Sequence, residues 1–154
     1  MPDKKITVLY VDDEQHNLVS FKATFRLKFN IITCISGDEA LKALKEHEVE
    51  IIITDQRMPE MTGVEFLESV LEIHPEPMRI LLTGYTDINA VIDAINKGKI
   101  YKYLTKPWDA KELEETIESA YHIYEQRKND KEYSKKLEVF NGQLEFLLRQ
   151  KLLS

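Results

Sequence analysis

From residue 5 to about residue 126, short apolar runs rich in Ile, Val and Leu alternate with longer stretches that carry apolar residues three or four positions apart. The short runs predict buried strands, and the longer stretches predict amphipathic helices. The expected strands are residues 6–11, 30–34, 50–54, 79–83 and 101–105. The expected helices are residues 15–28, 37–47, 63–73 and 87–97, and a further helix begins near residue 109.

This order of elements predicts one fold class. Strands that alternate strictly with helices form βαβ units, in which helices cover both faces of a parallel sheet. Five such units in about 120 residues predict an α/β fold, a flavodoxin-like doubly wound five-stranded sheet rather than a barrel. The expected strand order is 2-1-3-4-5, which places a crevice between the first and third strands at their carboxyl ends.

Several helix ends are marked by residues with a known local role. Ser36 with Glu39, and Asp109 with Glu112, have the spacing of a capping box, in which each side chain bonds the backbone of the other residue. Gly98 is expected to close the fourth helix, because glycine adopts the left-handed conformation that ends many helices.

The character of the chain changes after residue 125, where the strand pattern stops. We therefore expect one globular domain at residues 1–126 and a helical, coiled-coil-like tail or linker at residues 127–154, which extends the last helix. Five apolar residues of the tail follow one another at spacings of 4, 3, 4 and 3, namely Tyr133, Leu137, Phe140, Leu144 and Leu147. This seam covers only about two heptads. Asn141-Gly142 is a turn signal, but the seam keeps its phase across it and favours one continuous helix.

Polar side chains follow four of the expected strands at the point where each strand ends. Asp12 and Asp13 follow the first strand, Asp55 the third, Thr83 closes the fourth, and Lys106 follows the fifth. Ligands bind outside the carboxyl ends of the strands in an open parallel sheet. We therefore expect these five side chains to share one cleft.

The three carboxylates predict a magnesium site, since Mg²⁺ prefers hard oxygen ligands and offsets their mutual repulsion. Acidic residues also favour helix N-termini, which is the alternative for Asp12 and Asp13, but Asp55 beside them favours the metal. A carboxylate can attack phosphorus to form an acyl phosphate, and Lys106 and Thr83 would then contact the phosphoryl oxygens. Taken singly, Lys106 would be an ordinary loop residue and Thr83 a turn cap.

Four motifs occur in the order found in one family: VDDE at 11–14, DQRMPEMTG at 55–63, LTGY at 82–85 and YLTKP at 103–107. Together they resemble the signatures of response-regulator receiver domains of two-component signalling, over roughly residues 5–125. The resemblance implies that Asp55 is the phospho-acceptor. It also implies that Asp12 and Asp13 position Mg²⁺ together with Asp55 and the backbone carbonyl of Arg57.

The resemblance further implies roles for residues near the end of the domain. Lys106 would contact the phosphoryl group, with Pro107 in a cis Lys–Pro bond. Thr83 and Tyr103 would form the switch pair, in which the hydroxyl moves to the phosphoryl group and the ring turns inward. The stretch before Lys106 is one residue longer than the common form and offers Tyr101 as a second candidate for the switch aromatic.

The family resemblance also predicts partners. A sensor histidine kinase would supply the phosphoryl group, and the chain would catalyse only its own phosphotransfer and dephosphorylation. The output would pass through the surface of the fourth helix, fifth strand and fifth helix, and through the tail, to a homodimeric partner or an unidentified effector. Two alternatives stay open. One is a phosphorylation-independent interaction module, and the other is a hydrolase of the haloacid dehalogenase type.

The composition narrows these possibilities. Hydrophobic residues at 43% and charged residues at 31% are typical of a soluble globular protein, and the net charge of −6 argues against a nucleic-acid-binding surface over the whole molecule. No apolar run approaches the ~18 residues of a membrane helix. The one cysteine, Cys34, excludes an internal disulfide and suits a reducing compartment. We expect a cytoplasmic protein without nucleic-acid or membrane contacts.

Overall fold

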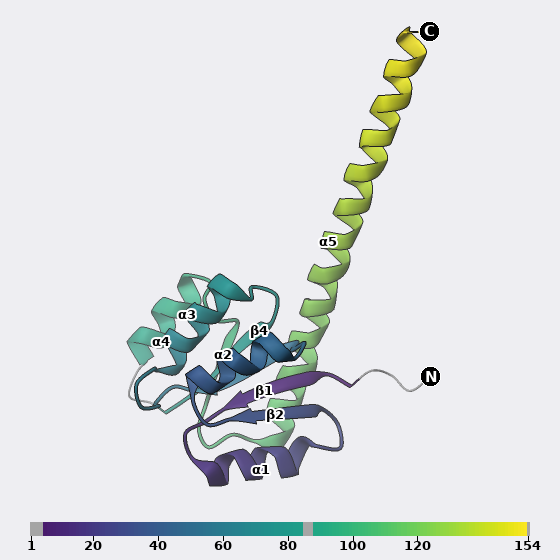
Figure 1. The fold of residues 1–154 in the computed structure, drawn as a ribbon. Coiled ribbons are helices and arrows are strands. Elements are labelled where there is room, and N and C mark those ends of the chain that lie inside the picture. The colour runs from purple at the N-terminus through teal and green to yellow at the C-terminus, as the bar shows by residue number, and fades with distance from the viewer. Residues whose placement is uncertain (1–4, 85–87, 154) are drawn as a thin grey trace. The chain divides into compact units, whose positions relative to one another are not determined.

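The computed structural model describes residues 5–84 and 88–153. All four strand pairings are parallel, and the strand order is β2-β1-β3-β4-β5, which confirms the flavodoxin-like doubly wound sheet (Figure 1). The strands are β1 (Thr7–Val11), β2 (Asn30–Cys34), β3 (Ile51–Asp55), β4 (Met78–Thr83) and β5 (Lys102–Thr105). Each strand begins and ends within one residue of its predicted position, because the buried apolar runs define the strands closely.

The helices are α1 (Gln15–Phe25), α2 (Gly37–Glu46), α3 (Gly63–Ile73), α4 (Ile88–Asn96) and α5 (Ala110–Leu153). The prediction for the first helix was three residues too long. The backbone amides of Lys28 and Phe29 both bond the carbonyl of Phe25, so the chain turns there. This turn buries Phe29 against the ring of Phe25, at 6.0 Å between centroids. Residue 87, the expected start of the fourth helix, lies outside the described residues.

The two faces of the sheet carry different cores. Leu9 and Val11 of β1 face a cluster that includes residues of α2, α3 and α4. Tyr10 lies between them on the strand and points to the opposite face, because side chains alternate along a strand. Its ring contacts Phe21 of α1 at 4.0 Å between centroids. Figure 1 shows α1 and α2 on opposite sides of β1 and β2.

The start of α5 belongs to the same face as α1. The side chains of Leu113, Ile117 and Ala120 are fully buried there. The ring of Trp108, just before the helix, contacts the rings of Phe21 and Phe25 of α1, at 5.9 and 5.7 Å between centroids. These contacts fix the segment that follows Lys106 against the sheet.

Three of the predicted helix ends have the expected geometry. The backbone amide of Glu39 donates to the Ser36 hydroxyl at 3.1 Å, but the Glu39 carboxylate accepts from Ile35 rather than closing the predicted capping box. A complete capping box occurs instead at Thr62 and Glu65, where α3 begins. At the start of α5, the backbone amide of Glu112 donates to the Asp109 carboxylate at 3.0 Å, and after α4 Gly98 has a φ of 73°.

Arg79 forms hydrogen bonds to both of the loops that precede β4 and β5. Its buried guanidinium donates to the carbonyl of Lys99 at 2.9 Å and to that of Pro77 at 3.0 Å. A longer bond of 3.3 Å reaches the carbonyl of Pro75. The sequence alone gave no sign of this arginine's role, since it stands inside an apolar run.

Cys34 ends β2 and is buried within the α2–α4 side of the core. Burial, together with the charge of Glu39, raises the pKa of its thiol to about 11. The cysteine therefore behaves as a small apolar side chain, as expected from its position in an apolar run.

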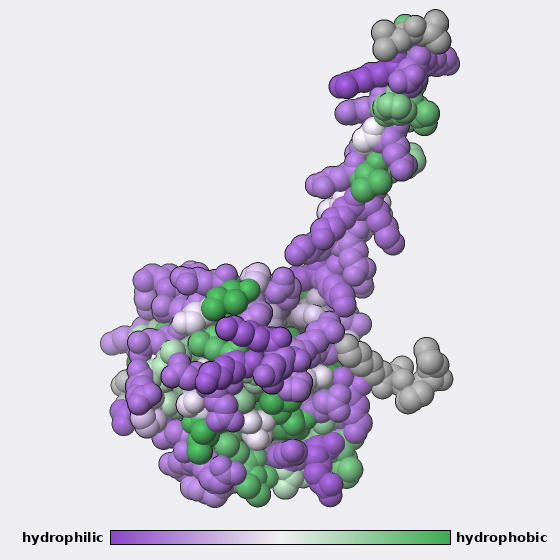
Figure 2. All heavy atoms as spheres, in the orientation of Figure 1, coloured by the Kyte–Doolittle hydropathy of each residue, from purple (hydrophilic) through white to green (hydrophobic). Residues whose placement is uncertain are grey.

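The chain divides into two compact units, Met1–Tyr121 and His122–Ser154. The second unit belongs to the helix α5, which continues through Asn141 and Gly142 as predicted. All five side chains of the predicted seam are exposed, and further exposed apolar residues are Val139, Phe146, Leu148 and Leu152. Figure 2 shows separate hydrophobic groups along a helix that is otherwise largely hydrophilic. Within residues 5–84 and 88–153, no helix is both long and apolar enough to cross a membrane.

Candidate functional site

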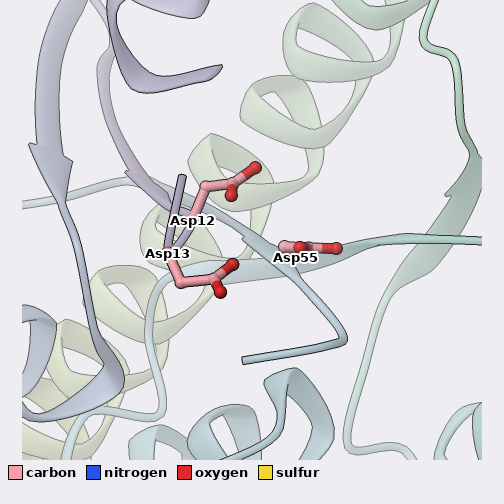
Figure 3. A group of neighbouring side chains, drawn as sticks. All are labelled: Asp12, Asp13 and Asp55. Atoms are coloured by element: carbon pink, nitrogen blue, oxygen red, sulfur yellow. The ribbon is translucent and has the colours of Figure 1, made fainter. Parts of the chain in front are cut away.

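Three carboxylates meet at the carboxyl ends of β1 and β3. Asp12 and Asp13 directly follow β1, and Asp55 is the last residue of β3. The two strands are neighbours in the sheet, with Val11 paired to Thr54. One carboxylate oxygen from each aspartate lies within 4.8 Å of the others (Figure 3). Asp12 is fully buried and Asp55 nearly so, which makes their negative charges costly to leave unbalanced.

Lys106 brings a positive charge to this group from the end of β5. Its Nζ lies 2.8 Å from Oδ1 of Asp55 and 3.9 Å from Oδ2 of Asp12. Its backbone amide donates to the carbonyl of Thr83 at 3.0 Å, which fixes the lysine beside the end of β4. The Lys106–Pro107 bond is cis, as predicted.

The electrostatic environment of Asp55 reflects both burial and this lysine. Burial raises the pKa of Asp55, whereas the hydrogen bond and charge of Lys106 oppose the shift. Asp12 adds to the increase through charge repulsion. The carboxylate is therefore held in a pocket where additional positive charge would stabilise its ionised form.

Asp12 accepts hydrogen bonds from three different elements of the site. The hydroxyl of Tyr10 donates to Oδ2 at 2.8 Å, and Nδ2 of Asn17 donates to the same oxygen at 3.1 Å. The backbone amide of Glu14 donates to Oδ1 at 3.0 Å. Burial, and then the charge of Asp12, raise the pKa of Tyr10, so its hydroxyl keeps the proton that it donates. Sequence reasoning missed both Tyr10 and Asn17.

Thr83 closes β4 at the same edge of the sheet, Tyr103 lies within β5, and Tyr101 lies before β5 at the opposite edge, where its amide donates to the carbonyl of Arg79. The Thr83 hydroxyl donates to the carbonyl of Gly84 at 3.0 Å, which uses its one proton. Tyr103 lies in β5, half-buried against the core on the α2–α4 side. Tyr101 precedes the strand and is also half-buried. The choice between the two tyrosines stays a prediction.

The loop from Asp55 to α3 is closed by Gly63 and Gln56. The amide of Gly63 donates to the carbonyl of Gln56 at 2.9 Å, and the Gln56 side chain accepts from Val64 at 2.9 Å. A β-carbon on Gly63 would lie 2.4 Å from the carbonyl oxygen of Asp55. Arg57, the predicted carbonyl ligand, lies in this loop with an exposed side chain.

These residues fit a divalent cation. Three carboxylates offer hard oxygen atoms within 4.8 Å of one another, and Lys106 supplies one positive charge against their three negative ones. A doubly charged ion with oxygen ligands would offset the excess. Mg²⁺ matches this donor set better than metals that prefer sulfur or imidazole ligands.

Comparisons with known proteins point to one family. The family model described as "Response regulator receiver domain" matches residues 8–118. The hydrogenase transcriptional regulatory protein HoxA of Cupriavidus necator is 43% identical over 120 residues, which cover 78% of this chain and 25% of that protein. The transcriptional regulatory protein ZraR of Salmonella typhimurium is 30% identical over 117 residues, which cover 75% of this chain and 26% of that protein.

Solved structures agree with this result. The crystal structure of a response regulator receiver domain protein from Clostridium thermocellum has a TM-score of 0.75 and 29% sequence identity, and covers 79% of this chain and 98% of that one. The chain spans about a quarter of the length of the curated relatives that it matches. The similarity therefore covers their receiver-like part and leaves most of each relative unmatched.

Proposed function

This chain belongs to the family of response regulator receiver domains, and on that premise we propose that Asp55 accepts a phosphoryl group from a sensor histidine kinase in a magnesium-dependent reaction. One observation carries the proposal. The Asp55 carboxylate lies 2.8 Å from the ammonium of Lys106 and within 4.8 Å of the carboxylates of Asp12 and Asp13. That arrangement supplies a nucleophile and a charge partner, and it forms a cation site beside them.

In the proposed reaction, a carboxylate oxygen of Asp55 attacks the phosphorus of a phosphohistidine. A P–O bond forms as the P–N bond breaks, and the imidazole leaves with the electron pair. Lys106 holds the carboxylate before transfer and then neutralises an oxygen of the phosphoryl group. Asp12 and Asp13, with Asp55 and the carbonyl of Arg57, would hold Mg²⁺, which lowers the repulsion between carboxylate and phosphoryl oxygens when bound.

The response to phosphorylation would begin at Thr83. Its hydroxyl would exchange the Gly84 carbonyl for a phosphoryl oxygen, which is the better acceptor because it is charged. Tyr103 would turn inward behind it, and the surface of α4, β5 and α5 would move between two arrangements. The protein is then a signalling domain rather than an enzyme with external turnover. The relatives HoxA and ZraR are named as transcriptional regulatory proteins, which suggests control of transcription as the output.

The first test is acyl-phosphate formation in the full chain. Incubation with acetyl phosphate and Mg²⁺ is expected to add one phosphoryl group that hydroxylamine removes, since acyl phosphates are cleaved by this nucleophile. Intact-mass spectrometry measures the addition, and peptide mapping is expected to place it at Asp55. Replacing Mg²⁺ by excess chelator should reduce labelling strongly, because the carboxylates would then repel the donor. Equal labelling without the metal would contradict the proposed reaction.

We also propose that the second unit pairs with the same helix of another copy through its exposed seam. Leu144 lies on the seam and is 45% exposed, and Val139 lies off it and is 62% exposed. Leu144→Glu is expected to weaken self-association by about tenfold or more, because burial of a Leu is worth roughly 1.5–3 kcal/mol. Val139→Glu is the matched control and should have little effect. Analytical ultracentrifugation measures both.

The same measurement separates the signalling proposal from the interaction module. We expect assembly to increase when beryllofluoride and Mg²⁺ mimic the phosphorylated state. An unchanged mass in both conditions would favour either a phosphorylation-independent module or an output that does not use assembly. Equal loss of assembly in the Leu144 and Val139 variants would contradict the seam.

A further inference from the structure

The two oxygens of Asp12 are used unequally. Oδ2 accepts from both the Tyr10 hydroxyl, at 2.8 Å, and the Asn17 amide, at 3.1 Å. Among the described residues, Oδ1 accepts one hydrogen bond, from the backbone amide of Glu14 at 3.0 Å. Each carboxylate oxygen has two lone pairs. Both lone-pair positions of Oδ2 are therefore occupied, and one on Oδ1 is available to a ligand.

The packing of the Tyr10 ring in the core fixes the position of its hydroxyl. Tyr10 lies in β1 and Asp12 directly follows that strand, and the hydrogen bond between them places both side chains on the same side of the sheet. The ring of Tyr10 is 1% exposed and lies on Phe21, with 4.0 Å between centroids and an interplanar angle of 34°. A ring packed in this way leaves the hydroxyl little freedom to leave Oδ2, so the lone-pair arrangement of Asp12 is built into the core.

We propose that Tyr10 is a positioning residue that restricts Asp12 to contact through a single oxygen, Oδ1, and thereby favours Mg²⁺ over Ca²⁺ at the acidic site. This inference rests on the proposed function, since it concerns the same metal. Mg²⁺ takes six ligands in octahedral geometry, keeps several waters and binds few carboxylates. Ca²⁺ takes six to eight oxygens and often uses both oxygens of one carboxylate. A carboxylate with one oxygen blocked suits the first ion and limits the second.

The test removes the hydroxyl and keeps the ring. Tyr10→Phe preserves the packing on Phe21 and frees one lone pair on Oδ2, so Asp12 can offer both oxygens to a larger ion. We expect the ratio of the Mg²⁺ to the Ca²⁺ dissociation constant to rise by roughly threefold to tenfold, the size of one hydrogen bond's net effect. Asn17→Ala removes the other donor to Oδ2 and should raise the ratio in the same direction.

Isothermal titration of the full chain with MgCl₂ and with CaCl₂ measures both constants. Thr24→Val is the matched control, because it removes an exposed hydroxyl of α1 that donates to the carbonyl of Ser20 at 2.8 Å. Near-ultraviolet circular dichroism and thermal unfolding check that each variant keeps its packing. If Tyr10→Phe does not fold, Asn17→Ala decides the question.

The outcomes are distinguishable. A rise in the ratio for Tyr10→Phe and Asn17→Ala, with none for Thr24→Val, supports the inference. A folded Tyr10→Phe protein with the wild-type ratio overturns it and leaves the phospho-acceptor proposal intact. A wild-type protein that binds neither ion at millimolar concentration overturns the metal site itself, and with it both proposals.

Discussion

Replacement of Asp55 by asparagine is expected to abolish phosphoryl uptake, the largest functional effect of any single substitution in this site. The amide has the shape of the carboxylate but is a poor nucleophile towards phosphorus, so no acyl phosphate forms. Its carbonyl oxygen can still accept from Lys106, which lies 2.8 Å from Oδ1 in the wild-type protein, so the pocket should keep its structure. Intact-mass spectrometry after incubation with acetyl phosphate and Mg²⁺ measures the loss.

Asp38→Asn is the matched control for this experiment. Asp38 is exposed in the first turn of α2 and should accept no phosphoryl group, so its variant is expected to label like the wild-type protein. Asp13→Asn is expected to label slowly, because it removes one of the three carboxylates at the cation site. A hydroxylamine-sensitive phosphoryl group that persists in Asp55→Asn would overturn the assignment of the acceptor.

Gly63→Ala is expected to destabilise the first unit by about 3 kcal/mol or more, the largest effect on stability. Its β-carbon would lie 2.4 Å from the carbonyl oxygen of Asp55, 2.7 Å from Cδ1 of Leu81 and 3.0 Å from Cα of Gln56. Two of these three neighbours are backbone atoms, so the clash is relieved only by moving the backbone at Asp55 and Gln56 or the start of α3. Urea-induced unfolding followed by circular dichroism measures the change.

Gly142→Ala provides the contrast within the same chain. Nothing lies within 4 Å of a β-carbon at this position, and the residue is in the interior of α5. Alanine in place of glycine in a helix is worth about 0.5–1 kcal/mol, so this variant should gain helicity at 222 nm. If the free energy of unfolding of Gly63→Ala lay within about 1 kcal/mol of that of the wild-type protein, the close approach at Asp55 would have little energetic consequence.

Much of the site was predictable because its residues stand at the carboxyl ends of the strands. The carboxyl ends of parallel strands share one edge of the sheet, so Asp12, Asp55 and Lys106 were expected to meet, and their contacts confirm this. The three central strands, β1, β3 and β4, follow from apolar runs that are buried on both faces. These features were predictable because the apolar pattern indicates both where each strand lies and at which edge of the parallel sheet it ends.

Features that depend on side-chain geometry were not predictable. Tyr10 stands inside an apolar run and reads as a core residue, yet its hydroxyl donates to Asp12. At Ser36 and Glu39 only one of the two capping-box bonds forms, from the Glu39 amide to the Ser36 hydroxyl. The Glu39 carboxylate accepts from the backbone amide of Ile35 instead. The bond from Thr83 to Gly84 follows from the local backbone, which the sequence does not specify.

The burial of Cys34 has a practical consequence for experiments on this protein. It is the only cysteine among the 154 residues, and burial holds the pKa of its thiol at about 11. Maleimides and other thiol reagents require an accessible thiolate, which this residue does not offer near neutral pH. A cysteine introduced on the exposed side of α4 or α5 would therefore take up a fluorophore or spin label selectively in an otherwise natural sequence, and could report the proposed conformational change.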